Sequence, residues 1–203
     1  MVDELKIIGV DTLYLLALIN PISKVSILAA FPVEQRDARF VTLARKSSIA
    51  AACILFVAMI LGDLILRLVF RVDLYSLRLA GGIVVFWVGL NALRSGHFFE
   101  KEANSDTSDM ALVPLACPMI AGPATIAACI GLPAQHGVVL STAALLLALG
   151  VNHVIMMCAH VIANALNRFS ILNAVVRITG LIVMTIGTQM ALDGIAGWIA
   201  GKH

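Results

Sequence analysis

Six long apolar segments constrain this chain more than any other feature. They run at roughly 5–31, 43–70, 75–95, 111–133, 137–166 and 171–200. About 20 apolar residues in a helix cross the roughly 30 Å hydrocarbon core of a bilayer. Backbone polar groups in lipid must be satisfied within the protein, and these runs are too long and lack the alternation of barrel strands. The sequence therefore predicts an all-α integral membrane protein with six transmembrane helices.

Composition agrees with a lipid-exposed surface. Hydrophobic residues make up 61% of the chain, charged residues 13%, and the mean hydropathy is +0.99. Soluble domains contain about 45–50% apolar and about 25% charged residues. The 203 residues form one predicted membrane domain, with the lipid bilayer as its surroundings. The net charge of +2 and the absence of a basic cluster argue against nucleic acid as a partner.

The four cysteines do not suggest a metal site. All lie within apolar stretches, with neither a CxxC pair nor a histidine at zinc-ligand spacing: Cys53, Cys117, Cys129 and Cys158. Cysteine often serves as a small apolar packing residue. We expect that role here, and we predict neither a metal nor a cofactor.

The distribution of lysine and arginine predicts the orientation. Alternating sides of six crossings collect five of these residues on the side of both termini and nine on the opposite side. Cytoplasmic loops carry an excess of positive charge. Both termini are therefore expected outside the cell.

A hydrophilic loop at about 96–110 divides the chain into two similar halves, about 1–95 and 111–203. The runs that begin at Arg78 (RLAGGIV) and Arg177 (RITGLIV) agree at Arg, Gly, Ile and Val, so the third and sixth segments look related. With three crossings per half, the second copy must be inverted relative to the first. Inverted repeats are typical of secondary transporters.

The first and fourth segments are each interrupted by proline near mid-membrane, at Asn20-Pro21 and at Ala121-Gly122-Pro123. Proline removes a backbone donor, so each step frees polar groups that must face protein, water or a ligand. The half-helices expected after the breaks, 22–31 and 124–132, present N–H groups that suit a carboxylate, while the carbonyls before each break suit an ammonium. A zwitterionic amino acid offers both. The alternative is two ordinary kinks, repaired locally by Ser, Thr or water.

The predicted substrate site therefore gathers the residues at the two breaks: Asn20, Pro21, Ser23, Ala121, Gly122, Pro123 and Thr125. Ionisable residues at membrane depth are functional candidates, and they are Asp11, Lys24, Asp63, His153, His160 and Asp193. His153, Asp63 and His160 are candidates for a proton relay. The alternatives are a hydrogen-bonded packing role for His153 and interfacial positions for Asp63 and His160. Asp11 is expected near the surface, away from the site.

Glycines recur on one face of the third and sixth segments, at Gly81, Gly82, Gly89, Gly180 and Gly187. Small residues allow transmembrane helices to approach closely. We expect close helix contact at these positions.

Four motifs together resemble the MarC family of bacterial inner-membrane proteins: Asn20-Pro21-Ile22, the run 77–82 (LRLAGG), the segment 113–126 (VPLACPMIAGPATI) and the stretch from Arg177 to Gly187. The resemblance covers essentially the whole chain. It implies six helices and transport of small neutral amino acids such as alanine and glycine, in a family historically associated with antibiotic resistance. Ala124 departs from the family pattern, which more often has glycine there, so its methyl group could narrow the site.

The sequence, with the resemblance, thus predicts a secondary active transporter of small neutral amino acids. Since no nucleotide-binding motif is present, the energy source is expected to be an ion gradient, with protons as the candidate ion. Efflux of antibiotics or other small amphipathic compounds is an alternative that calls for a larger apolar cavity. A passive channel is another, because broken helices can form a filter. An enzyme is not expected, because the chain has no GxSxG, no HExxH and no paired mid-membrane aspartates. The oligomeric state does not follow from the sequence.

Overall fold

The computed structural model describes residues 2–28, 38–96, 98, 117, 119–168 and 171–201. These residues form helices and short connections: α1 (Val2–Ile19), α2 (Pro21–Leu28), α3 (Ala38–Leu64), a π-helical stretch (Ile65–Phe70), α4 (Leu74–Ser95), α5 (Pro123–His136), α6 (Val138–Met157), α7 (Ala159–Arg168) and α8 (Leu172–Ala200). The prediction of an all-α protein is confirmed for this part of the chain.

Five helical spans are long and apolar enough to cross a membrane: Val2–Val25, Phe40–Phe70, Leu74–Ser95, Val138–Met157 and Leu172–Ala200. They match five of the six predicted segments. The fourth predicted segment contains α5, which has only 14 residues, and 111–116 lies outside the described residues, as does most of the predicted loop at 96–110. The sixth crossing and the inverted repeat therefore stay predictions.

Two segments differ from the uninterrupted helices that apolar length suggested. The fifth breaks at a turn at Cys158, between α6 and α7. The second ends in the π-helical stretch, which Arg71 terminates in a left-handed conformation with φ 51°. Neither the turn at Cys158 nor the π-helical stretch contains a proline or a glycine. The sequence therefore held no helix-breaking residue from which these two features could be predicted.

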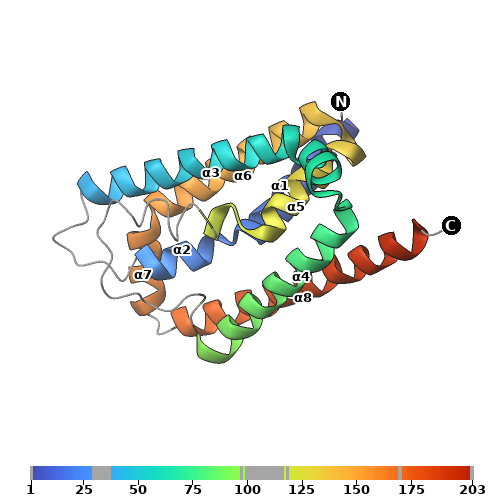
Figure 1. Cartoon of the computed structure of the whole chain (residues 1–203). Coiled ribbons are helices and arrows are strands. Elements are labelled where there is room, and N and C mark those ends of the chain that lie inside the picture. The colour runs from blue at the N-terminus through green and yellow to red at the C-terminus, as the bar shows by residue number, and fades with distance from the viewer. Residues whose placement is uncertain are drawn as a thin grey trace.

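The helices are arranged in three groups (Figure 1). α3 runs beside α6, α4 runs beside α8, and α1, α2 and α5 lie between these two pairs. A buried core joins α1, α3, α5 and α6, with Leu15, Leu55 and Ala148 among its members. Many apolar side chains point outward instead, for example Trp87 at 61% and Val139 at 81% exposure. Such a surface is suited to lipid tails.

Glycine permits the close contact of α4 with α8. A Cβ placed on Gly187 would lie 2.4 Å from the backbone nitrogen of Phe86, and one on Gly89 would lie 2.4 Å from that of Met184. Gly194 approaches Leu79 in the same way. Early residues of α4 thus meet late residues of α8, so the two helices are antiparallel. The predicted close approach is confirmed.

A side-chain hydrogen bond joins α1 to α5. Asp11 is buried at 4% exposure, and its Oδ2 lies 2.7 Å from Nδ1 of His136, at the end of α5. Asp11 does not line the candidate site described below, as expected, but its burial and its histidine partner were not anticipated. The pair spans 125 residues of sequence.

We predict that Gly187→Ala weakens the contact between α4 and α8 by about 1–3 kcal/mol, because the added methyl group collides with backbone that cannot rotate away. Thermal unfolding in detergent micelles measures the effect. Gly150→Ala is the matched control, since nothing lies within 4 Å of a Cβ there. Alanine is the better helix former, so this control should be neutral or slightly stabilising. Equal effects of the two changes would contradict the prediction.

Asp11→Asn should destabilise the protein by about 1.5–3 kcal/mol, because it removes the charge from a buried hydrogen-bonded pair. Asp63→Asn is its control. Asp63 pairs with Arg67 at 2.8 Å, but both side chains are more than half exposed, and such pairs contribute about 0–1 kcal/mol. Thermal unfolding of both variants under the same conditions gives the comparison. If Asp63→Asn lowered the stability as much as Asp11→Asn does, burial of the pair would not determine its contribution to stability.

Candidate functional site

The first helix break is built from Asn20 and Pro21. The Asn20 N–H still donates to the Leu16 carbonyl at 2.8 Å, and Asn20 then takes a left-handed conformation with φ 51° that ends α1. Asparagine tolerates this conformation better than most residues. Pro21 opens α2 as its first residue, where its missing N–H costs nothing. The Ser23 hydroxyl donates to the Asn20 carbonyl at 2.7 Å.

The second break is built from Gly122 and Pro123. Gly122 caps α5 in an extended conformation, and its carbonyl accepts the N–H of Ile126 at 2.9 Å. The N–H groups of Ala124 and Thr125 lie in the first turn of α5, where a helix offers no acceptor. Pro123 has no N–H, so the Met119 carbonyl, four residues earlier, loses the donor that a continuous helix would provide.

Lys24 joins the two breaks. Its side chain is fully buried, with 0% exposure. The Lys24 Nζ donates to the carbonyls of Ile19 and Asn20, which end the first half of the interrupted helix, the latter at 3.2 Å. It also donates to the Met119 carbonyl at 2.7 Å. One ammonium thus satisfies carbonyls freed at both proline steps.

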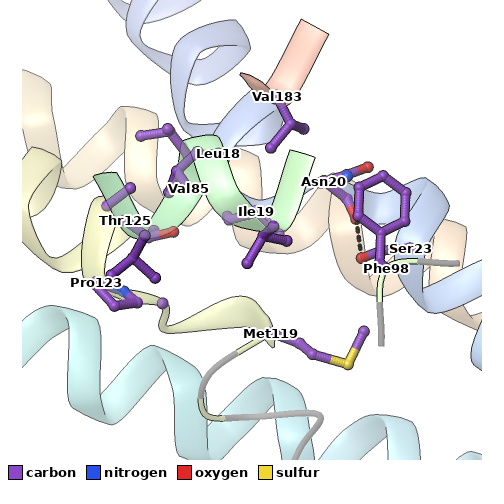
Figure 2. Close-up of a pocket in the computed structure, with 14 residues that line it drawn as sticks. Leu18, Ile19, Asn20, Ser23, Val85, Phe98, Met119, Pro123, Thr125 and Val183 are labelled. Carbon is purple, nitrogen blue, oxygen red and sulfur yellow. Dashed lines mark hydrogen bonds between the residues drawn. The ribbon is translucent and has the colours of Figure 1, made fainter. Parts of the chain in front are cut away.

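A cavity of about 130 Å³ lies between the breaks and the α4–α8 pair. Its lining residues are Leu18, Ile19, Asn20, Ser23, Val84, Val85, Val88, Phe98, Met119, Gly122, Pro123, Ala124, Thr125 and Val183. Figure 2 shows Asn20 and Ser23 at one end of this set and Pro123 and Thr125 at the other. Valines of α4 and α8 supply an apolar wall, and none of the described lining residues is charged.

Asn20 brings an unused acceptor to this cavity. Its side chain is only 7% exposed, and its Oδ1 has no hydrogen-bond partner among the described residues. Buried polar atoms are nearly always paired, so an orphaned one calls for a partner other than the residues that the structure describes. The amide oxygen suits an N–H donor of a bound molecule.

The structure brings most of the predicted substrate residues together. Asn20, Ser23, Gly122, Pro123 and Thr125 all line the cavity. Pro21 and Ala121 occupy the breaks beside it without lining it.

The three relay candidates lie elsewhere. His153 Nδ1 lies 2.9 Å from the Ser48 hydroxyl. His160 lies 3.2 Å from the Asn164 amide on an exposed face of α7, and Asp63 forms its exposed pair with Arg67. None of the three lines the cavity.

Two features of the site escaped the sequence analysis. Lys24 was recognised as an ionisable residue at membrane depth, but its link to Met119 depends on a fold contact across 95 residues. The expectation that the freed carbonyls are available to a substrate ammonium changes accordingly, because Lys24 occupies those of Ile19, Asn20 and Met119. The apolar wall from α4 and α8 was not predicted either, because nothing in the sequence except hydrophobicity marks its valines.

Comparison with known proteins agrees with the motifs at the breaks. A family model described as MarC family integral membrane protein matches residues 5–199. A UPF0056 membrane protein of Pyrococcus horikoshii is 32% identical, with 95% of each chain covered. The UPF0056 membrane protein YvbG of Bacillus subtilis is 31% identical, with 90% of this chain and 91% of the relative covered.

The UPF0056 inner membrane protein MarC of Salmonella paratyphi A is 27% identical over the full length of both chains. No solved structure matches this chain. The family model and the relatives span the apolar helices, both breaks and the cavity between them. The chain therefore belongs to the MarC family of integral membrane proteins.

Proposed function

We propose that the protein is a secondary active transporter of small neutral amino acids such as alanine and glycine, rather than an enzyme. The observation that carries this proposal is the cavity at which both helix breaks meet, lined by Asn20, whose amide oxygen has no partner among the described residues. Transporters commonly bind substrate where discontinuous helices meet near the membrane midplane.

The two ends of the cavity complement the two ends of a zwitterion. The substrate carboxylate is assigned to the first turn of α5, where the N–H groups of Ala124 and Thr125 and the helix dipole favour an anion. The substrate ammonium is assigned to Asn20 Oδ1, at the other end of the lining in Figure 2. Ser23 and Thr125 add hydroxyl groups. A neutral zwitterion needs no further charged partner.

The size of the cavity favours a small substrate. Its volume of about 130 Å³ exceeds the roughly 10–15 Å³ that one water needs and falls below the roughly 300 Å³ at which drug-sized pockets begin. Efflux of amphipathic antibiotics, the second candidate function, would require the cavity to widen considerably. A passive channel would use the same breaks but would show no substrate saturation.

The proposal also includes an inverted repeat of the two halves and the location of both termini outside the cell. Transport by alternating access would arise from movement of one half against the other around the cavity. The excess of lysine and arginine on the side opposite the termini supports periplasmic termini in an inner membrane.

We predict saturable uptake of radiolabelled alanine and glycine into liposomes that contain the purified protein. Asn20→Gly keeps the left-handed backbone and removes the acceptor, so it should weaken alanine binding about tenfold or more. Thr125→Val should weaken it about two- to tenfold through loss of one neutral hydrogen bond. Thr188→Val, on an exposed face of α8, is the matched control and should transport normally.

Folded wild-type protein that takes up neither amino acid would refute the proposal. Uptake that rises linearly with concentration would favour a channel, and uptake blocked by amphipathic antibiotics in preference to amino acids would favour efflux.

Ala124→Gly should broaden selectivity toward larger neutral amino acids, because it removes a methyl group from the cavity wall. Competition of serine, valine and leucine against labelled alanine measures the change. Ala128→Gly is the control, since it makes the same substitution in α5 outside the lining and carries the same helix-propensity cost of about 1 kcal/mol. An identical competition profile for both variants would show that the methyl group of Ala124 does not limit substrate size.

A further inference from the structure

Lys24 is a buried cation without a counter-ion in the part of the chain that the structure describes. Its side chain has 0% exposure. The ion pairs among described residues join Arg67 to Asp63 and His136 to Asp11, and neither includes Lys24. A buried charge is costly unless its partners compensate for lost water. Within the described ranges, the compensation comes from backbone carbonyls alone.

These carbonyls come from both breaks. Ile19 and Asn20 end the helix before the first proline, and Met119 is the carbonyl that Pro123 deprives of its donor. In transporters with discontinuous helices, unwound carbonyls and half-helix C-termini coordinate the ion that drives transport. In this chain the ammonium of Lys24 fills the corresponding position.

The number of hydrogen bonds that the Lys24 amine can donate depends on whether it is protonated. An ammonium has three N–H donors and no acceptor, and Lys24 donates to three carbonyls. A neutral amine has two N–H donors and a lone pair, so it can serve only two carbonyls and repels the third. Loss of the proton therefore removes at least one charge-assisted hydrogen bond, although the Asn20 carbonyl would still accept from Ser23.

Most of the titratable groups on the elements that pack against Lys24 have partners of their own. α2 packs against α6, α7 and α8. Their titratable side chains are His153, bonded to Ser48; His160, bonded to Asn164; Arg168; Arg177, bonded to the Leu93 carbonyl; and Asp193, bonded to Gln189. Cys117 precedes Met119 in the segment that carries the third carbonyl. Among the described residues, none of these groups hydrogen-bonds to Lys24.

We propose that Lys24 is the coupling-ion site of this transporter, with a proton on its amine in the place of a bound sodium ion. The proposal rests on the proposed function. With the proton bound, Lys24 ties the α1–α2 break to the Met119 carbonyl beside the cavity. When the breaks separate and water enters, the proton leaves to that water, the neutral amine releases a carbonyl, and reprotonation from the other side restores the tie.

The first test uses the wild-type protein in liposomes. A pH gradient should accelerate alanine uptake in buffers without sodium, and a sodium gradient at equal pH should not. Acceleration by sodium alone would overturn the proposal, because the position assigned to the ion is filled by Lys24.

The second test does not require a transport substrate. Lys24→Ala removes three methylene groups and the ammonium, which together correspond to n-propylammonium. Added n-propylammonium should raise the melting temperature of this variant in a saturable manner, and 1-propanol, its uncharged counterpart, should not. Lys46→Ala removes a lysine from an exposed position of α3 and should respond to neither compound. If Lys24→Ala does not fold, Lys24→Met keeps the volume, and gradient-driven accumulation by that variant is measured instead.

The results with the Lys24 variants distinguish a failure of the role proposed for Lys24 from a failure of the proposed amino-acid transport. Proton-driven accumulation of alanine should fall at least about tenfold in Lys24→Ala or Lys24→Met, the factor that corresponds to one charge-assisted hydrogen bond. Full proton-driven accumulation by either variant would overturn the role of Lys24 while leaving amino-acid transport intact. Rescue by n-propylammonium in a protein that transports no amino acid would keep the cation site and refute only the substrate.

Discussion

Backbone groups that proline frees inside a membrane must find partners within the protein, and Lys24 meets this constraint. Hydrocarbon offers neither donors nor acceptors, so two broken helices would be costly at this depth. The ammonium of Lys24 satisfies the carbonyls of Ile19, Asn20 and Met119 together. The breaks are therefore held against each other, and the cavity beside them keeps its shape. A charge that would itself be unstable in lipid is stabilised by the same carbonyls that require it.

The opposite wall of the cavity follows from a different principle. α4 and α8 meet backbone to backbone at Gly89, Gly187 and Gly194, where any side chain would collide with the partner helix. Gly187 and Gly194 are seven residues apart, nearly two helical turns, so they face the same way. Tight packing of this kind favours movement of the two helices as one body. The cavity thus lies between a glycine-packed pair and a polar junction of broken helices.

Local chemistry explains what the sequence could predict. Apolar length revealed five of the crossings, proline located both breaks, and glycine spacing indicated the contact between α4 and α8. Five of the seven predicted substrate residues line the cavity for the same reason, since Asn20, Ser23, Gly122, Pro123 and Thr125 belong to the breaks themselves.

The bond from Lys24 to Met119 and the pair of Asp11 with His136 join residues 95 and 125 positions apart. Such contacts depend on how helices are packed, which no local pattern specifies. The turn at Cys158 lacked a breaker residue and was missed as well.

The charge distribution around the cavity sets what it can accept. No lining residue in the described part of the chain is charged, and Lys24 has its three donors committed to carbonyls of lining residues rather than directed to a ligand. A cationic substrate would meet this buried positive charge without an opposing carboxylate, and a strongly anionic one would have only the first turn of α5 as counterpart. A zwitterion, the substrate class proposed above, needs a donor-rich end and an acceptor-rich end in one small volume, and the first turn of α5 and the Asn20 amide oxygen are groups of these two kinds. Under that proposal, discrimination among zwitterions would fall to the apolar wall, where Val85, Val88 and Val183 would limit the side chain that fits.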